Sequence, residues 1–178
     1  KLSGLSFHTT IVLSVTAALL IIGTLTIFLL EHNAALKGMT TDKKILISLF
    51  QSVTARTAGF NTVSMNVLSN GTCFFIMILM FIGGAPGSCA GGVKVTIVGI
   101  FVSMIMSHLR GKEHNSLFSR TIPPDTSKKA ITIVITAVVI ISLFFFLILI
   151  SEGENNQAGI IRSGFIHLAF ESMSAFGT

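Results

Sequence analysis

The chain has 178 residues, of which 51% are hydrophobic and only 11% are charged, and its mean hydropathy is +0.85. Soluble proteins carry about a quarter charged residues, so the composition excludes an ordinary soluble domain and favours a membrane protein. The net charge of +5 is not gathered into a basic patch interleaved with aromatic residues, and Trp and Tyr are missing, which argues against nucleic-acid binding.

Two long apolar stretches predict membrane-spanning helices. Thr9 to Leu30 and Ala130 to Ile150 contain no ionisable side chain, and about twenty helical residues cross about 30 Å of hydrocarbon. Basic residues outnumber acidic ones in the connection from Arg110 to Lys129, so the positive-inside rule places residues 109–129 in the cytoplasm. We predict a multi-pass protein of the cell membrane. Because the chain starts with Lys1, we interpret it as part of a longer protein.

An internal repeat organises the chain. A shift of about 121 residues lays the first apolar stretch over the second and places Thr57 over Thr178. The predicted domains are one complete unit at 1–108, a cytoplasmic connection at 109–129, and the first helix and truncated pore loop of a second unit at 130–178.

Each unit contains a second apolar segment that is too short to cross the bilayer. In the first unit it runs from about residue 45 to 54, and ten helical residues reach only about 15 Å. The second unit has a comparable segment at about 160–175. Such segments must enter the membrane and return, and irregular backbone at that depth is tolerated only where it is buried or lines a watery cavity.

The third apolar segment, Thr72 to His108, is interrupted by a stretch with five glycines and a proline. Such a composition does not remain helical. We therefore predict two half-helices, at about 73–82 and 93–107, joined by a loop inside the membrane. The loop residues are Gly83, Gly84, Ala85, Pro86, Gly87, Ser88, Cys89, Ala90, Gly91 and Gly92. The predicted fold class is all-α, with polytopic transmembrane helices and re-entrant pore loops.

The end of the first re-entrant segment is suited to binding a dehydrated cation. The Thr57-Ala58-Gly59 turn offers successive carbonyl oxygens, and the C-terminal end of the preceding helix adds a negative dipole. The alternative is an ordinary glycine-containing turn between two helices. We expect Arg56, beside this turn, to point away and bind carbonyls at the end of its own helix. Lys94 either binds carbonyls of the Gly-rich loop or reaches the cytoplasmic interface.

Other chemistries are disfavoured. The five histidines and two cysteines lack metal-ligand spacing. The Gly-rich stretch does not match a phosphate-binding loop, because Val93 separates Gly92 from Lys94. Ser88 has no nucleophile-elbow spacing around it. We predict that the protein is not an enzyme and carries no bound cofactor.

Two segments carry a resemblance to a known family. Thr54-Ala55-Arg56-Thr57-Ala58-Gly59-Phe60 and the stretch from Phe81 to Lys94 resemble the superfamily of Trk, Ktr and plant HKT potassium transporters, especially the membrane subunits of bacterial Ktr systems. Members have four units of helix, pore loop and helix around one pseudo-fourfold pore. The chain is similar to the third unit and the start of the fourth.

The resemblance implies roles for particular residues. The selectivity filter would include Thr57, Ala58, Gly59, Phe60, Gly177 and Thr178, with K⁺ bound by Thr57, Ala58, Gly59 and Thr178. The loop from Gly83 to Gly92 would be an intramembrane gate. Implied partners are the lipid bilayer, a second copy in a homodimer and a cytoplasmic nucleotide-binding ring, with Na⁺ as a candidate activator or coupled ion. The alternative function is a cation-coupled secondary transporter with discontinuous helices.

Overall fold

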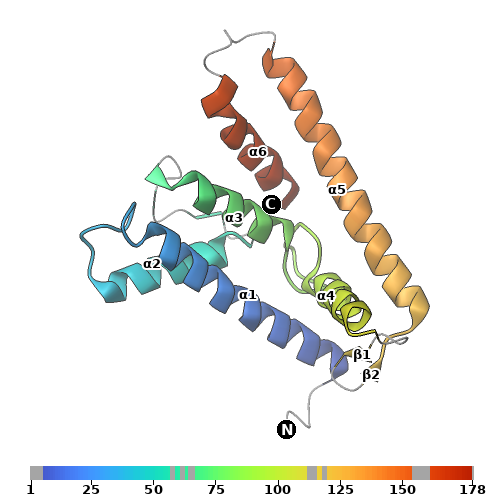
Figure 1. The fold of residues 1–178 in the computed structure, drawn as a ribbon. Coiled ribbons are helices and arrows are strands. Elements are labelled where there is room, and N and C mark those ends of the chain that lie inside the picture. Colours follow the sequence, from blue (N-terminus) through green and yellow to red (C-terminus); the bar gives the residue numbers. More distant parts are fainter. Residues whose placement is uncertain are drawn as a thin grey trace.

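The computed structural model describes residues 6–56, 59–60, 63, 67–111, 116–117, 120–153 and 161–177. These residues form α1 (Phe7–Glu31), α2 (Thr41–Thr54), α3 (Asn70–Phe81), α4 (Val95–Leu109), β1 (Ser116–Leu117), β2 (Arg120–Thr121), α5 (Pro124–Gly153) and α6 (Ile161–Gly177) (Figure 1). The predicted helical fold is confirmed. The two-residue strands pair antiparallel within the connection at 109–129 and were not predicted.

The helices α1 and α5 are long and apolar enough to cross a membrane. Their 25 and 30 residues correspond to about 38 Å and about 45 Å of helix. Ser6 caps α1 by accepting a hydrogen bond from the Thr9 amide at 3.2 Å. Much of the apolar surface of α5 is exposed, as a lipid-facing helix requires.

The helices α2 and α6 are longer than predicted but still shorter than a span. The helix α2 begins at Thr41, about four residues before the expected start, because the polar first turn is also helical. Its 14 residues reach about 21 Å and the 17 residues of α6 about 25 Å. Both lengths remain below the thickness of the hydrocarbon core.

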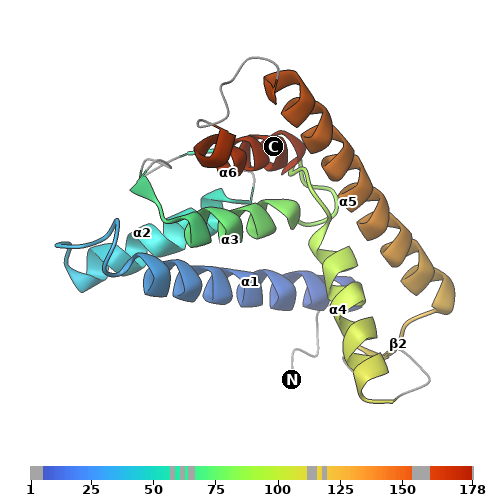
Figure 2. The same ribbon diagram turned by 45° about the horizontal axis from the view of Figure 1, so that its top comes forward.

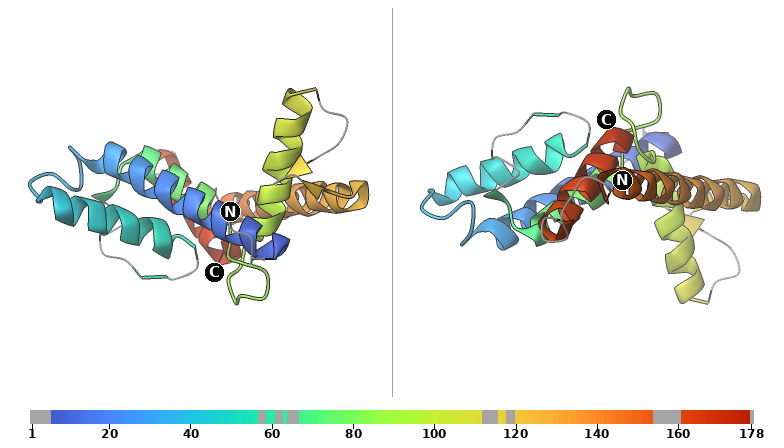
Figure 3. Two further views of the ribbon diagram at one scale, coloured as in Figure 1. Left: turned by 90° about the horizontal axis from the view of Figure 1, so that it is seen from below. Right: turned by 90° about the horizontal axis from the view of Figure 1, so that it is seen from above.

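Helices α1, α2 and α3 lie side by side, while α4 leaves this layer steeply (Figure 2). The close approach of α1 to α2 depends on Gly23, where a Cβ atom would collide with Ser52 Oγ. A buried cluster that includes Ile27, Ile76 and Leu79 holds the three helices together. Figure 3 shows α4 and the loop before it projecting to opposite sides, with the C-terminal end of α6 beside the loop.

Candidate functional site

The turn after α2 contains the glycine that the sequence singled out. Gly59 has φ = +73°, in the left-handed region that side chains other than glycine rarely adopt. Glycine is therefore the residue that this backbone angle favours. Thr57 and Ala58, together with Thr178 at the corresponding place in the second unit, lie outside the described residues.

Thr54 closes this turn and was not predicted as a site residue. Its hydroxyl donates to the Phe60 carbonyl oxygen at 2.7 Å and accepts from the Phe60 amide at 3.0 Å. The Thr54 side chain is buried, whereas Phe60 is 72% exposed. One buried hydroxyl thus ties the end of α2 to Phe60, six positions further along the chain. The signal that could have found it is a Thr placed where the helix stops and the glycine turn begins.

The Gly-rich loop is closed at its base by backbone hydrogen bonds. The Gly83 amide donates to Val93 O at 3.0 Å, and the Val93 amide donates to Phe81 O at 2.9 Å. The Val95 amide donates to Gly84 O at 3.1 Å. A Cβ on Gly83 would collide with the Gly91 carbonyl oxygen. The chain entering the loop at Gly83 and the chain leaving it at Gly91 therefore approach more closely than a residue with a side chain would allow. The predicted break between α3 and α4 is therefore an ordered, closed loop.

Lys94 binds the loop, which decides between its two alternatives. Its Nζ atom donates to Ala90 O at 2.5 Å and to Ser88 O at 3.3 Å. Ser88 also donates its hydroxyl to Ala85 O at 2.6 Å, which stabilises the tip. The ammonium group thus supplies hydrogen bonds to two loop carbonyl oxygens that lie outside any helix or strand ladder.

The expectation for Arg56 is wrong in its partner. Among the described residues, the Arg56 side chain makes no hydrogen bond to a carbonyl oxygen of α2, where Gln51 O and Val53 O accept from the backbone amides of Ala55 and Arg56. Its Nη2 atom instead donates to the carbonyl oxygen of Gly83, at 3.4 Å. The side chain is long enough to cross from the end of α2 to the loop, which only the tertiary arrangement could reveal.

The end of α6 also lies against the loop. A Cβ on Gly91 would lie 2.8 Å from the Gly177 carbonyl oxygen, so the two backbones are in close contact. The rings of Phe81 and Phe176 stack with centroids 6.1 Å apart and planes at 20°. Gly177, from the second predicted filter segment, and the loop predicted as a gate are thus neighbours.

Sequence reasoning missed Glu31, the fully buried last residue of α1. Its Oε1 atom accepts from the Ser69 amide at 2.9 Å, the Ser69 hydroxyl at 2.8 Å and the Thr72 hydroxyl at 2.5 Å. Its Oε2 atom accepts from the Ala35 amide at 3.1 Å. Because Ser69 caps α3, the carboxylate faces the positive end of that helix.

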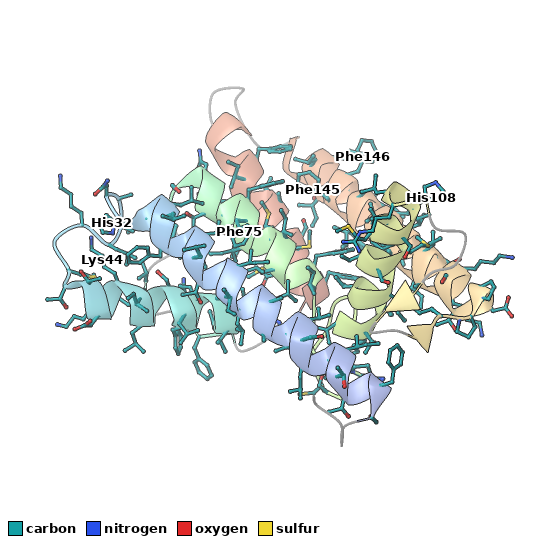
Figure 4. All side chains as sticks on the ribbon, turned by 60° about the horizontal axis from the view of Figure 1, so that its bottom comes forward. His32, Lys44, Phe75, His108, Phe145 and Phe146 are labelled. Atoms are coloured by element: carbon teal, nitrogen blue, oxygen red, sulfur yellow. The ribbon has the colours of Figure 1, made fainter. Side chains whose placement is uncertain are left out.

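A second link closes the same end of the bundle. The Lys44 ammonium of α2 donates to the His32 carbonyl oxygen at 2.8 Å, and both residues are seen together in Figure 4. Glu31 and Lys44 therefore fix the order of α1, α2 and α3 at one end, away from the Gly-rich loop.

Comparison with known proteins assigns the chain to a family. The family described as TrkH, cation transport protein, matches residues 4–178. The chain belongs to the TrkH family. It is 35% identical over 97% of its length to Ktr system potassium uptake protein B of Bacillus subtilis, and 32% identical over its whole length to the potassium/sodium uptake protein NtpJ of Enterococcus hirae.

The fold agrees with a solved TrkH-family structure. The potassium transporter TrkH from Vibrio parahaemolyticus superposes with a TM-score of 0.63 at 17% sequence identity, covering 92% of this chain and 41% of that one. The chain spans 37% and 39% of the Bacillus and Enterococcus relatives. It is therefore a TrkH-family membrane segment that covers well under half of the length of these relatives.

Proposed function

We propose that the protein containing this chain takes up potassium through a channel-like membrane pore. The observation that carries the proposal is the link between a short helix, the turn at its end and the Gly-rich loop. A helix too short to span the bilayer ends in a turn with a left-handed glycine, and that turn is tied to an ordered Gly-rich loop. Family membership, and the names of the relatives as potassium and potassium/sodium uptake proteins, support a cation as the transported species.

In this proposal Thr57, Ala58, Gly59 and Phe60 form one quarter of a selectivity filter, and Gly177 and Thr178 begin another. Carbonyl oxygens replace the hydration shell of the ion, and K⁺ is bound at Thr57, Ala58, Gly59 and Thr178. The C-terminal ends of α2 and α6 favour a cation there through their helix dipoles. The left-handed angle of Gly59 supports this role, because it permits carbonyl directions that a β-carbon would restrict.

The loop from Gly83 to Gly92 acts as the gate. Its position against Gly177, and its internal closure by Lys94, support an obstruction that moves as one body. The domain division at 1–108, 109–129 and 130–178 is part of the same proposal, with α1 to α4 as one unit and α5 and α6 as the start of the next. A homodimer, a cytoplasmic nucleotide-binding ring and a role for Na⁺ stay predictions from the resemblance.

The competing function is a secondary transporter in which the loop residues bind the substrate or a coupling ion. Ion flux in liposomes containing the full-length protein separates the two. A channel-like pore gives K⁺ currents that follow the K⁺ gradient and ignore gradients of the other ions present. A fixed stoichiometry between K⁺ flux and the flux of Na⁺ or H⁺ would overturn the pore.

A further inference from the structure

Arg56 connects two parts of the molecule that are far apart in the sequence. Its Nη2 atom donates to the Gly83 carbonyl oxygen at 3.4 Å, across 27 residues of chain. The Nε atom of the same side chain is buried and has no hydrogen-bond partner among the described residues. A half-buried cation whose hydrogen bond within the described residues is a single long one to a neutral acceptor is sensitive to small movements of that acceptor.

Gly83 is a point from which such a movement would spread through the whole loop. Its amide is bonded to Val93 O, and its α-carbon packs against the Gly91 carbonyl with no room for a side chain. Both ends of the loop therefore move together with Gly83. Lys94 joins the base to the tip through Ala90 O, so the displacement reaches the exposed Cys89 beside it.

The other end of the link is the turn after α2. Arg56 directly precedes Thr57 in the sequence, and the Thr54 hydroxyl ties the end of α2 to Phe60. The second contact between a filter segment and the loop, at Gly177 and Gly91, is made by backbone packing. Arg56 is thus the place where a side-chain substitution removes a link without altering the backbone.

We propose that Arg56 is a positioning residue that couples the turn after α2 to the Gly-rich loop through its hydrogen bond to Gly83. Ion occupancy of the turn then changes the position of the loop, and the position of the loop changes the affinity of the turn for the ion by the same factor. That the ion is K⁺ rests on the proposed function. The Arg56–Gly83 link itself does not depend on which ion passes.

The exposed thiol of Cys89 provides a test that needs no transport. The full-length protein, with Cys89 as its single reactive cysteine, is labelled with a maleimide in K⁺ and in N-methylglucamine buffer. The wild-type labelling rate is expected to differ between the two buffers. Arg56→Met is expected to label roughly three- to tenfold faster, as the loss of one long hydrogen bond of ordinary net strength predicts, and to lose the difference between buffers.

Control variants separate this link from a general effect of charge or folding. Arg110→Met removes an exposed arginine at the end of α4 and should leave the rate unchanged. Arg56→Lys keeps the charge but shortens the reach, so its rate should lie between those of wild type and Arg56→Met. If Arg56→Met does not fold, as judged by size-exclusion chromatography, Arg56→Lys and Arg56→Gln carry the same comparison.

The outcomes distinguish this inference from the proposed function. Equal labelling rates in wild type and the Arg56 variants would overturn the link even if potassium flux is normal. A wild-type rate that is independent of K⁺, with a faster Arg56→Met, would keep the link and overturn its coupling to the ion. If Arg56→Met is labelled faster but the wild-type protein passes no K⁺, the link is kept and the proposed function is overturned.

Discussion

The hydroxyl of Thr54 both donates to the carbonyl oxygen of Phe60 and accepts from its amide, at 2.7 and 3.0 Å. This pair of hydrogen bonds sets the size of the turn that holds Gly59. A hydroxyl is the smallest group that supplies both a donor and an acceptor in one place. The turn is consequently tied to the end of α2, and its shape should respond to the side chain at position 54.

Replacing Thr54 with Val tests this control of the turn. The change keeps the volume but leaves the Phe60 amide and carbonyl without their partner, at a cost of about 1–3 kcal/mol. We expect the K⁺ over Na⁺ permeability ratio, measured from reversal potentials in liposomes, to fall. Thr54→Ser keeps the hydroxyl and should retain the ratio. Loss of the ratio in Thr54→Ser, with none in Thr54→Val, would show that the methyl group, and not the hydrogen bonds, matters.

Gly59→Ser tests the left-handed backbone at the centre of the turn. No atom of the described residues lies within 4 Å of a Cβ at this position, so the strain that they reveal comes from φ = +73°. That strain costs about 1–2 kcal/mol for a residue with a side chain. We expect weaker selection of K⁺ over Na⁺, measured as relative permeability. Gly71→Ser is the matched control, because Gly71 also has open space among the described residues but no left-handed angle. An unchanged permeability ratio in Gly59→Ser would show that Gly59 is not part of the filter.

Shortening the Gly-rich loop tests the gate. Removing Gly87 and Ser88 from the tip leaves the hydrogen bonds between Gly83 and Val93 at the base in place. If the loop obstructs the pore, K⁺ flux in liposomes should rise several-fold. Cys89→Ala keeps the length of the loop and serves as the control. Loss of flux from a protein that is folded and expressed normally would instead favour a binding role for the loop.

Glu31→Gln tests the buried carboxylate that joins α1 to α3. Glutamine offers one acceptor oxygen in place of two, and its amide group then faces either the Ala35 amide or the donors of Ser69 and Thr72. Losing charge-assisted hydrogen bonds should lower the free energy of unfolding by about 2–3 kcal/mol. Thermal unfolding of the full-length protein in detergent measures this. Asp42→Asn, at the exposed start of α2, should cost less than about 1 kcal/mol.

Gly23→Ala tests the close packing of α1 against α2. The added methyl group would collide with Ser52 Oγ and lie 3.0 Å from Ser52 Cβ, so α2 must move away. Overpacking of this kind costs about 1–3 kcal/mol, and we expect lower thermal stability and slower K⁺ uptake. Adding Ser52→Ala removes the worst contact and should restore part of both. A double variant no better than Gly23→Ala would place the damage elsewhere.

The comparison of prediction with structure is clearest at the helices. Runs of about twenty apolar residues, short segments of half that length and a cluster of glycines predicted α1, α5, α2 and the break between α3 and α4. These features are local, because hydrophobic length and backbone freedom are properties of consecutive residues. The polar first turn of α2 was missed because apolar character, and not its capping residue Thr40, was used to place the start of the helix.

The sequence by itself thus determined that the chain is a membrane protein, and which of its helices are long and apolar enough to cross the bilayer. Only the tertiary structure decided the partners of the polar side chains: Arg56 with Gly83, Glu31 with Ser69 and Thr72, and Lys94 with Ala90. The physical reason is that a buried charge must find acceptors or donors wherever the fold brings them. The partners of Arg56 and Glu31 come from segments distant in the sequence. The partner of Lys94 comes from the Gly-rich loop, whose shape depends on the hydrogen bonds between Gly83 and Val93.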